Sequence, residues 1–132
     1  MRRGAPYDPY RHADELGLRV ETVPFSPHDG LWLPRRDLIL LRSGMKAIQE
    51  RCVLAHEIGH AVHGHVDDGP RNEAVADRYA AERLVDRDHL LDLMAWSPDA
   101  GRWSLELDVT TRMLATYLEL HRLEFARRPA AA

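Results

Sequence analysis

The sequence lacks the features that would mark a disulfide-bonded or membrane-spanning protein. Cys52 is the one cysteine among 132 residues, so the chain cannot form an internal disulfide, and its apolar neighbours are typical of a small core residue. No apolar run approaches the length of about 20 residues that a membrane helix needs. The basic start at residues 1–6 is followed by no apolar core, so we expect no signal peptide and a cytoplasmic protein.

Excess positive charge is also missing. The formal net charge is −3, which argues against a nucleic-acid-binding surface. An alternative in which Arg122, Arg127 and Arg128 contact phosphates conflicts with this charge balance, so direct nucleic-acid binding is not expected. Hydrophobic residues make up 45% and charged residues 30%, as in soluble globular proteins. We therefore expect one domain over residues 1–132.

The amino-terminal part alternates between helical and strand-like segments. Residues 8–17 have a helix-forming composition, and residues 18–23 alternate apolar and polar side chains before Pro24. Apolar runs at 31–33 and 37–41 predict two strands paired as a hairpin. Together these segments predict a small three-stranded antiparallel sheet that needs a cover on one face.

The rest of the chain is predicted to be mainly helical. An apolar helix over about 46–64 is the element that can cover the sheet. After a loop that ends at Pro70, further helices are predicted at about 71–85 and 86–95, followed by a last helical region over about 103–127. The expected fold class is α+β, with the sheet packed against the first long helix.

The pattern H-E-x-x-H, formed by His56, Glu57 and His60, lies inside the predicted helix 46–64. Residues four apart in a helix are separated by about 40° around its axis, so both histidines face one side and can bind a zinc ion. Glu57 can reach a water bound to that zinc. The alternative is a helix that carries two histidines by chance, and the apolar residues around the motif favour a buried site.

A catalytic zinc needs three protein ligands and an open position for water, so a third ligand is expected on a neighbouring element. Glu73 and Asp77 lie four apart in the next predicted helix, so both carboxylates occupy one face. We predict that Glu73 is the third ligand and that Asp77 orients the ring of His56. The alternative is a pair of solvated acids near a positive helix end, and the preceding motif favours the ligand role.

Other side chains near the motif are candidates for a further catalytic role. In the longer motif H-E-x-x-H-x-x-G-x-x-H, glycine would stand at His63 and the third histidine at Val66, so that zinc class is excluded. Peptide hydrolysis also needs a donor to the developing oxyanion. Tyr79, His63 and His65 are candidates, although both histidines are also typical of polar residues at a helix end.

With these residues in place, the run from about 51 to 85 resembles the ImmA/IrrE-like zinc metallopeptidases, which belong to the thermolysin-like group with a glutamate third ligand. The likeness rests on RCVLAHEIGH at 51–60 and EAVADRYAAE at 73–82. The strand expected at 37–41 extends it. The resemblance implies zinc at His56, His60 and Glu73, the ligands proposed above.

The family's helix-turn-helix-like tail is similar to LDVT at 107–110, within a helical tail over about 103–128 in which Thr110 caps the final segment. Two positions depart from the family pattern. An acidic residue commonly stands where this chain has Val75, and Leu-Met-Pro commonly ends the segment that here reads Leu-Val-Asp at 84–86. Neither departure removes a proposed ligand.

The resemblance implies an intracellular endopeptidase that acts on a regulatory protein, often a helix-turn-helix repressor encoded nearby in a phage, mobile element or stress-response locus. Peptide hydrolysis would use one zinc ion to activate water, and Glu57 would pass the proton of that water to the leaving amine. The alternative is a metal-stabilised interaction module that binds and sequesters a repressor without cutting it. Glu57 separates the two functions, because a purely structural metal site would not need it.

Overall fold

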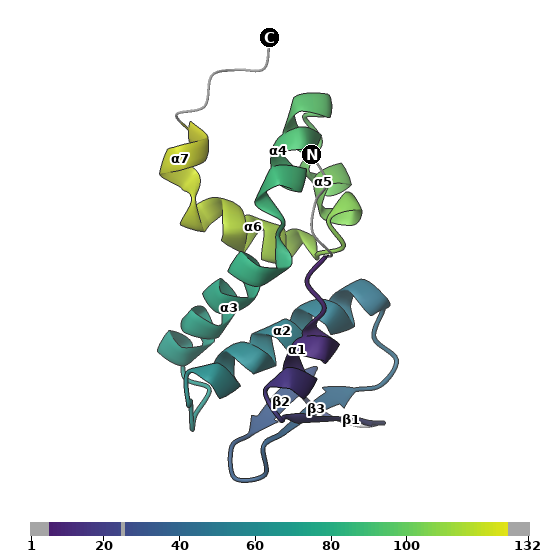
Figure 1. Ribbon diagram of the computed structural model, residues 1–132, viewed down its shortest axis with the longest axis vertical. Coiled ribbons are helices and arrows are strands. Elements are labelled where there is room, and N and C mark those ends of the chain that lie inside the picture. Colours follow the sequence, from purple (N-terminus) through teal and green to yellow (C-terminus); the bar gives the residue numbers. More distant parts are fainter. Residues whose placement is uncertain (1–5, 25, 127–132) are drawn as a thin grey trace.

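The computed structural model describes residues 6–24 and 26–126, which contain three strands and seven helices (Figure 1). The predicted α+β class is confirmed, because the sheet packs against the helix that carries the motif and every later element described is helical. No described helix has both the length and the apolar character needed to cross a bilayer. The elements are α1 Pro9–Glu15, β1 Arg19–Val23, β2 Gly30–Leu33, β3 Leu38–Arg42, α2 Ala47–Val62, α3 Pro70–Leu84, α4 Arg87–Trp96, α5 Ala100–Glu106, α6 Thr111–Leu120 and α7 Arg122–Ala126.

The sheet has the strand order β1-β3-β2. β2 and β3 form the predicted antiparallel hairpin, in which Gly30 pairs with Leu41 and Leu33 pairs with Leu38. β1 pairs with β3 in parallel, so the sheet is mixed where a purely antiparallel sheet was predicted. The loop between β1 and β2 leaves a gap one strand wide, and β3 fills it. β1 and β2 run in opposite directions, so β3, which is antiparallel to its hairpin partner β2, runs parallel to β1.

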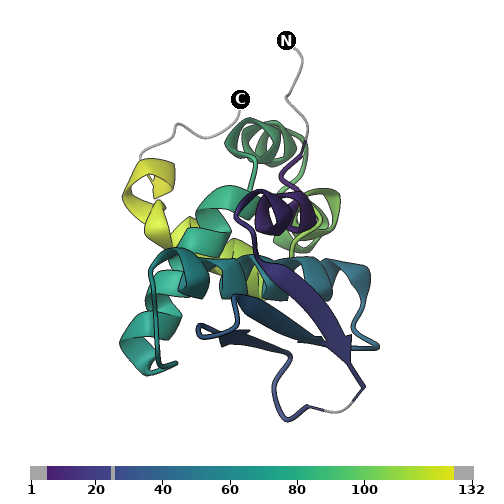
Figure 2. The ribbon, with the colours of Figure 1, turned by 60° about the horizontal axis from the view of Figure 1, so that its bottom comes forward.

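Helices α1 and α2 lie together on one side of the sheet (Figure 2). Ile39 and Leu41 of β3 are two residues apart and point to this side, where they are fully buried in one cluster with Leu54 and Ile58 of α2. Burial of an aliphatic side chain of this size contributes about 1.5 to 3 kcal/mol. The packing fixes the rotation of α2, and His56, midway between Leu54 and Ile58, therefore faces away from the sheet.

Helix α3 runs alongside α2 at a close approach that a glycine allows (Figure 1). A Cβ atom added at Gly59 would lie 3.0 Å from both the Cα and the carbonyl oxygen of Ala76, which is 0% exposed. The absent side chain thus sets the distance between the two helices. Glu73 and Asp77, which precede and follow Ala76 on α3, are brought close to α2 as a result.

The helices α4 to α6 pack on α2 and α3 at the end away from the sheet (Figure 1). Cys52 is 4% exposed in this second core cluster, as expected for a core residue. The helical tail is interrupted at Asp108, whose φ angle is 55°, and the Thr110 hydroxyl accepts the Met113 N–H as the predicted cap. A second break at His121, which separates α6 from α7, was not predicted.

The arginines considered for phosphate binding belong to the end of the chain. Arg122 begins α7 and lies 3.6 Å from the carboxylate of Glu119. Arg127 and Arg128 lie outside the described residues. The tail predicted over 103–128 is therefore described only as far as residue 126.

Replacement of Gly59 by alanine should destabilise the protein, although alanine favours a helix interior over glycine by about 1 kcal/mol. The added methyl group would meet the backbone of Ala76 at 3.0 Å, and overpacking of a core costs about 1 to 3 kcal/mol. Urea unfolding measures the difference. Ala115→Gly at an exposed position of α6 calibrates the propensity term. A Gly59→Ala variant more stable than the wild type would contradict the close approach.

Candidate metal centre

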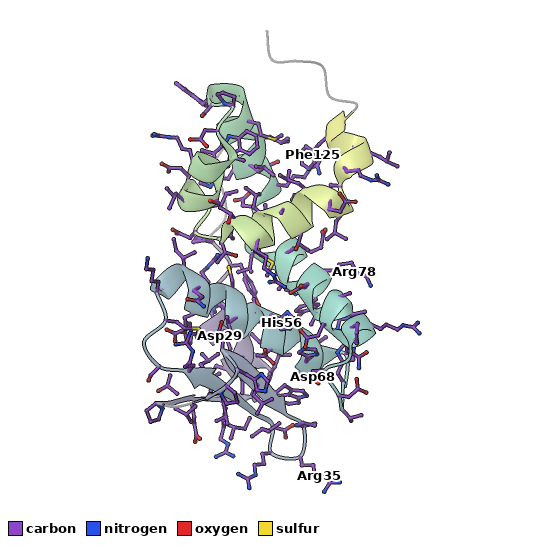
Figure 3. The ribbon with its side chains drawn as sticks, turned by 180° about the vertical axis from the view of Figure 1, so that it is seen from behind. Asp29, Arg35, His56, Asp68, Arg78 and Phe125 are labelled. Atoms are coloured by element: carbon purple, nitrogen blue, oxygen red, sulfur yellow. The ribbon has the colours of Figure 1, made fainter. Side chains whose placement is uncertain are left out.

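The two histidines of the motif converge with Glu73 between α2 and α3. The Nε2 atoms of His56 and His60 lie 3.1 Å apart. The carboxylate oxygens of Glu73 lie 2.8 Å from Nε2 of His56 and 3.0 Å from Nε2 of His60. Among the described residues, this is the one group whose ligand atoms cluster as a metal site requires, all within 4.8 Å of one another. Figure 3 shows His56 on α2, between Asp29 and Asp68.

The second ring nitrogen of each histidine has its own hydrogen-bond partner. Nδ1–H of His56 donates to Oδ1 of Asp77 at 2.7 Å, and Oδ2 of Asp77 accepts from Arg112 of α6 at 2.6 Å. Nδ1 of His60 lies 2.9 Å from Nδ1 of His65. Because both Nδ1 atoms are engaged, both Nε2 lone pairs are left to face the same point between the helices.

This donor set fits a zinc ion. Zinc binds imidazole nitrogen and carboxylate oxygen at about 2.0 to 2.2 Å, so neighbouring ligand atoms of a tetrahedral site lie about 3.3 Å apart or slightly more. The distances of 2.8 to 3.1 Å among His56, His60 and Glu73 are only slightly shorter. Small outward movements of the side chains would admit the ion. Three protein ligands leave the fourth position open, as catalytic sites require.

Burial and charge act in opposite directions on the ionisable groups of the site. Burial lowers the pKa of His56, but the hydrogen bond with Asp77 and the nearby carboxylates outweigh it, so this pKa is raised. Burial and the neighbouring His56 lower the pKa of His60. Burial raises the pKa of Asp77 less than the contacts with His56 and Arg112 lower it, so this pKa is depressed. Asp77 therefore stays ionised at neutral pH as the acceptor for His56.

Glu57 is only 7% exposed, because β2 lies directly against it. A Cβ atom added at Gly30 of β2 would lie 3.0 Å from Oε2 of Glu57 and 2.6 Å from Cγ1 of Val53. Burial raises the pKa of the Glu57 carboxyl to about 7, and the charge of Glu73 adds to this effect. A carboxyl group with a pKa near neutrality can both take up and release a proton, as a general base must.

The converging side chains open into a cleft of about 910 Å³. Its lining includes Gly30 and Trp32 from β2, Asp68 from the loop after α2, and Arg112 from the start of α6. These residues come from the sheet and from the helical part that follows it, so the cleft lies along the junction between the sheet and the helices. Its size is within the range of pockets that hold small ligands or short peptide segments.

The three candidate oxyanion donors occupy different places. His65 lines the cleft. The rings of Tyr79 and His63 instead contact each other edge to face, with centroids 5.5 Å apart, and neither residue is among the described residues that line the cleft. His63 Nδ1 also donates to the carbonyl oxygen of Gly59 at 2.8 Å. Of the three candidates, His65 is therefore the one that the described structure places on the cleft wall.

Two residues of the site were not predicted. Arg112 reaches Asp77 from α6, 35 positions further along the chain, and no local pattern marks such a contact. The strand predicted at 31–33 begins one residue earlier, at Gly30. A glycine at the start of a strand is a known sign of a close backbone approach, and that signal could have identified it.

Glu57→Gln should stabilise the metal-free protein at pH 8. The folded-state pKa is about 7 against an ordinary value of 4.5, so the buried charge costs on the order of 3 kcal/mol above pH 7. Because the folded pKa is raised, this cost develops between about pH 4.5 and 7 and is absent below that window. Urea unfolding of chelator-treated protein at pH 4 and 8 tests this. Glu106→Gln on exposed α5 is the control, and equal midpoint shifts for both variants would contradict the assignment.

The comparisons with known proteins agree with this geometry. The chain matches the family model described as the IrrE N-terminal-like domain, a peptidase family, over residues 13–127. It is 34% identical over 68 residues to the radiation response metalloprotease IrrE of Deinococcus radiodurans, an alignment that covers 52% of this chain and 20% of that relative. The chain thus spans about a fifth of the relative's length. The family match includes every converging residue, and the chain belongs to the IrrE N-terminal-like family of metallopeptidase domains.

Proposed function

We propose that the chain is a zinc-dependent endopeptidase in which His56, His60 and Glu73 hold one zinc ion and Glu57 is the general base. The observation that carries this proposal is the arrangement of the two imidazoles. Each has its Nδ1 atom engaged elsewhere and its Nε2 atom within 3.0 Å of the Glu73 carboxylate. Two nitrogens and one carboxylate oxygen are a common ligand set of catalytic zinc.

Zinc supplies a Lewis acid that lowers the pKa of water to about 7 and polarises a scissile carbonyl. The chain supplies the proton transfers. Glu57 takes a proton from the attacking water at a carboxylate oxygen and donates it to the leaving amine nitrogen. In the metal-free chain, burial raises the pKa of this carboxyl group, so Glu57 takes up a proton more readily than an exposed carboxylate would. Asp77 keeps the proton of His56 on Nδ1, which leaves Nε2 free to bind the metal.

The edge strand β2 supports an extended peptide as the substrate. β2 is at the edge of the sheet and lines the cleft. The Arg42 N–H donates to the Asp29 carbonyl, so antiparallel alternation turns the backbone groups of Gly30 and Trp32 away from β3. In the proposed function these groups pair with an extended segment of the substrate, a recognised mode of peptide binding. In this arrangement Gly30 would lie between the bound segment and Glu57.

The proposed substrate is an intracellular regulatory protein, most directly a helix-turn-helix repressor. This part of the proposal rests on the family resemblance, and the similar IrrE protein is named a radiation response metalloprotease. The competing function is a metal-stabilised module that binds the same regulator and sequesters it. The burial of Glu57 favours catalysis, because a structural metal site would not require a buried carboxyl group beside the ligands.

The general-base assignment predicts that Glu57→Gln retains zinc but loses activity by about 10² to 10⁴-fold, the usual contribution of such a group. Zinc content is measured by mass spectrometry. Activity is measured as fragments of β-casein and of a helix-turn-helix regulator encoded beside the gene. If the variant cuts as fast as the wild type, Glu57 is not the base. If the wild type binds the regulator stoichiometrically and produces no fragments, the sequestering function is correct.

Gly30→Ala should lower kcat and leave zinc affinity within about threefold. The new methyl group would displace the Glu57 carboxylate and the Val53 side chain, both within 3.0 Å, and a misplacement of about 1 Å can cost about 10²-fold in rate. The zinc ligands lie on other elements and should not move. The control is Leu33→Ala at the far end of β2, which tests for general damage to the strand. Gly44→Ala would not serve, because the φ angle of Gly44 is 87° and alanine there would be strained. Equal losses in the two variants would contradict the role of Gly30.

A further inference from the structure

The two proposed histidine ligands have different partners behind them. His56 is backed by the carboxylate of Asp77, whereas Nδ1 of His60 lies 2.9 Å from another imidazole nitrogen, Nδ1 of His65. The rings of His60 and His65 are inclined by 67°, with centroids 5.1 Å apart, so the contact is directed between nitrogens and is not a stack. His60 is 4% exposed, and His65 is half-buried on the cleft wall.

The end of α2 explains why His65 returns to His60. Gly64 has a φ angle of 66° and its N–H donates to the carbonyl of Ala61, while the N–H of His65 donates to the carbonyl of His60. These two hydrogen bonds form a Schellman motif, in which the second residue beyond the helix end is folded back over the last turn. The usual apolar contact between these two positions is here a contact between two imidazoles. The backbone hydrogen bonds of this motif therefore bring positions 60 and 65 together, whichever side chains these positions carry.

The protons on the two rings follow from the ligand role of His60. A neutral imidazole has one N–H, and a metal ligand binds through the nitrogen that lacks it. If Nε2 of His60 faces the metal, its proton is on Nδ1 and can only be donated to Nδ1 of His65. That atom must then be unprotonated, so the proton of His65 is on Nε2. The ring of His63 stacks on the face of the His65 ring, with centroids 5.5 Å apart and planes inclined by 23°.

We propose that His65 is the positioning residue of His60, which accepts the Nδ1–H of His60 and thereby fixes the orientation and tautomer of that ligand. The inference rests on the proposed function, since it requires a metal at His60. It also assigns different electrostatic environments to the two imidazole ligands. Asp77 places a negative charge behind His56, and Arg112 partly offsets that charge, whereas His65 places a neutral acceptor behind His60.

The first test measures zinc affinity of the full chain by competition with a chromophoric chelator. Loss of an orienting partner typically weakens metal binding about 10- to 100-fold, and His65→Leu should fall in this range. His65→Asn should bind within about threefold of the wild type, because its Oδ1 atom can accept the same hydrogen bond where Nδ1 stood. His28→Leu removes an imidazole from the same cleft, and the contacts described for His56, His60 and Glu73 do not involve His28, so the zinc affinity of this variant should be unchanged.

The second test determines which ring nitrogen carries the proton in His60 and in His65. Nitrogen NMR of the histidine rings in the zinc-loaded wild type should show His60 protonated at Nδ1 and His65 protonated at Nε2. Thermal unfolding of the metal-free variants checks that the motif around Gly64, which uses only backbone hydrogen bonds, is intact. A destabilised fold alone would not change the tautomer of His65, so this readout separates positioning from a purely structural role.

The outcomes distinguish this inference from the proposed function. If the wild type binds no zinc, the proposed function fails. If the wild type binds one zinc and His65→Leu binds it as tightly as His28→Leu does, the metal site stands and the positioning role of His65 is overturned. It is also overturned if His65→Asn is as weak as His65→Leu, because an acceptor at that place would then be insufficient, or if His65 carries its proton on Nδ1.

Discussion

The close contact between Gly59 and Ala76 is the constraint on which the candidate metal centre depends. Two of the proposed ligands come from α2 and one from α3, and metal bonds tolerate deviations of only about 0.2 Å. Each helix is held separately as well, because α2 packs on the sheet and α3 is tied to α6 through Asp77 and Arg112. The position of the two helices that form the site is therefore supported by the sheet on one side and by α6 on the other.

The edge strand β2 links two requirements of the proposed reaction. Gly30 lies against Glu57 and removes it from water, which raises the pKa of Glu57, while residues of the same strand line the cleft. A shift of β2 would alter both the proton affinity of the base and the line along which a peptide could bind. The absence of a side chain at Gly30 thus contributes to chemistry as well as to packing.

Local patterns carried much of the information about the fold and the site. The period of a helix was enough to place His56 and His60 on one face and Glu73 and Asp77 on another, and the described structure has these faces opposed. The direction of β1 relative to β3 was not predictable in this way, because it depends on which strand enters the gap left by a loop. Arg112 was missed for a similar reason, since its partner lies on another helix and neither residue is unusual in its own segment.

The free edge of β2 has a further consequence for the solution behaviour of the chain. Unpaired strand edges can recruit the edges of other molecules and start aggregation, and proteins limit this by keeping such strands short and flanking them with proline or charge. β2 has only four residues, Pro27 precedes it, and Pro34, Arg35 and Arg36 follow it. In the proposed function β2 pairs with a short extended segment of the substrate, whereas its short length and the charges that follow it disfavour a sheet that continues between copies. The length of β2 and its flanking prolines and charges would then together favour one added substrate strand over a second copy of the chain.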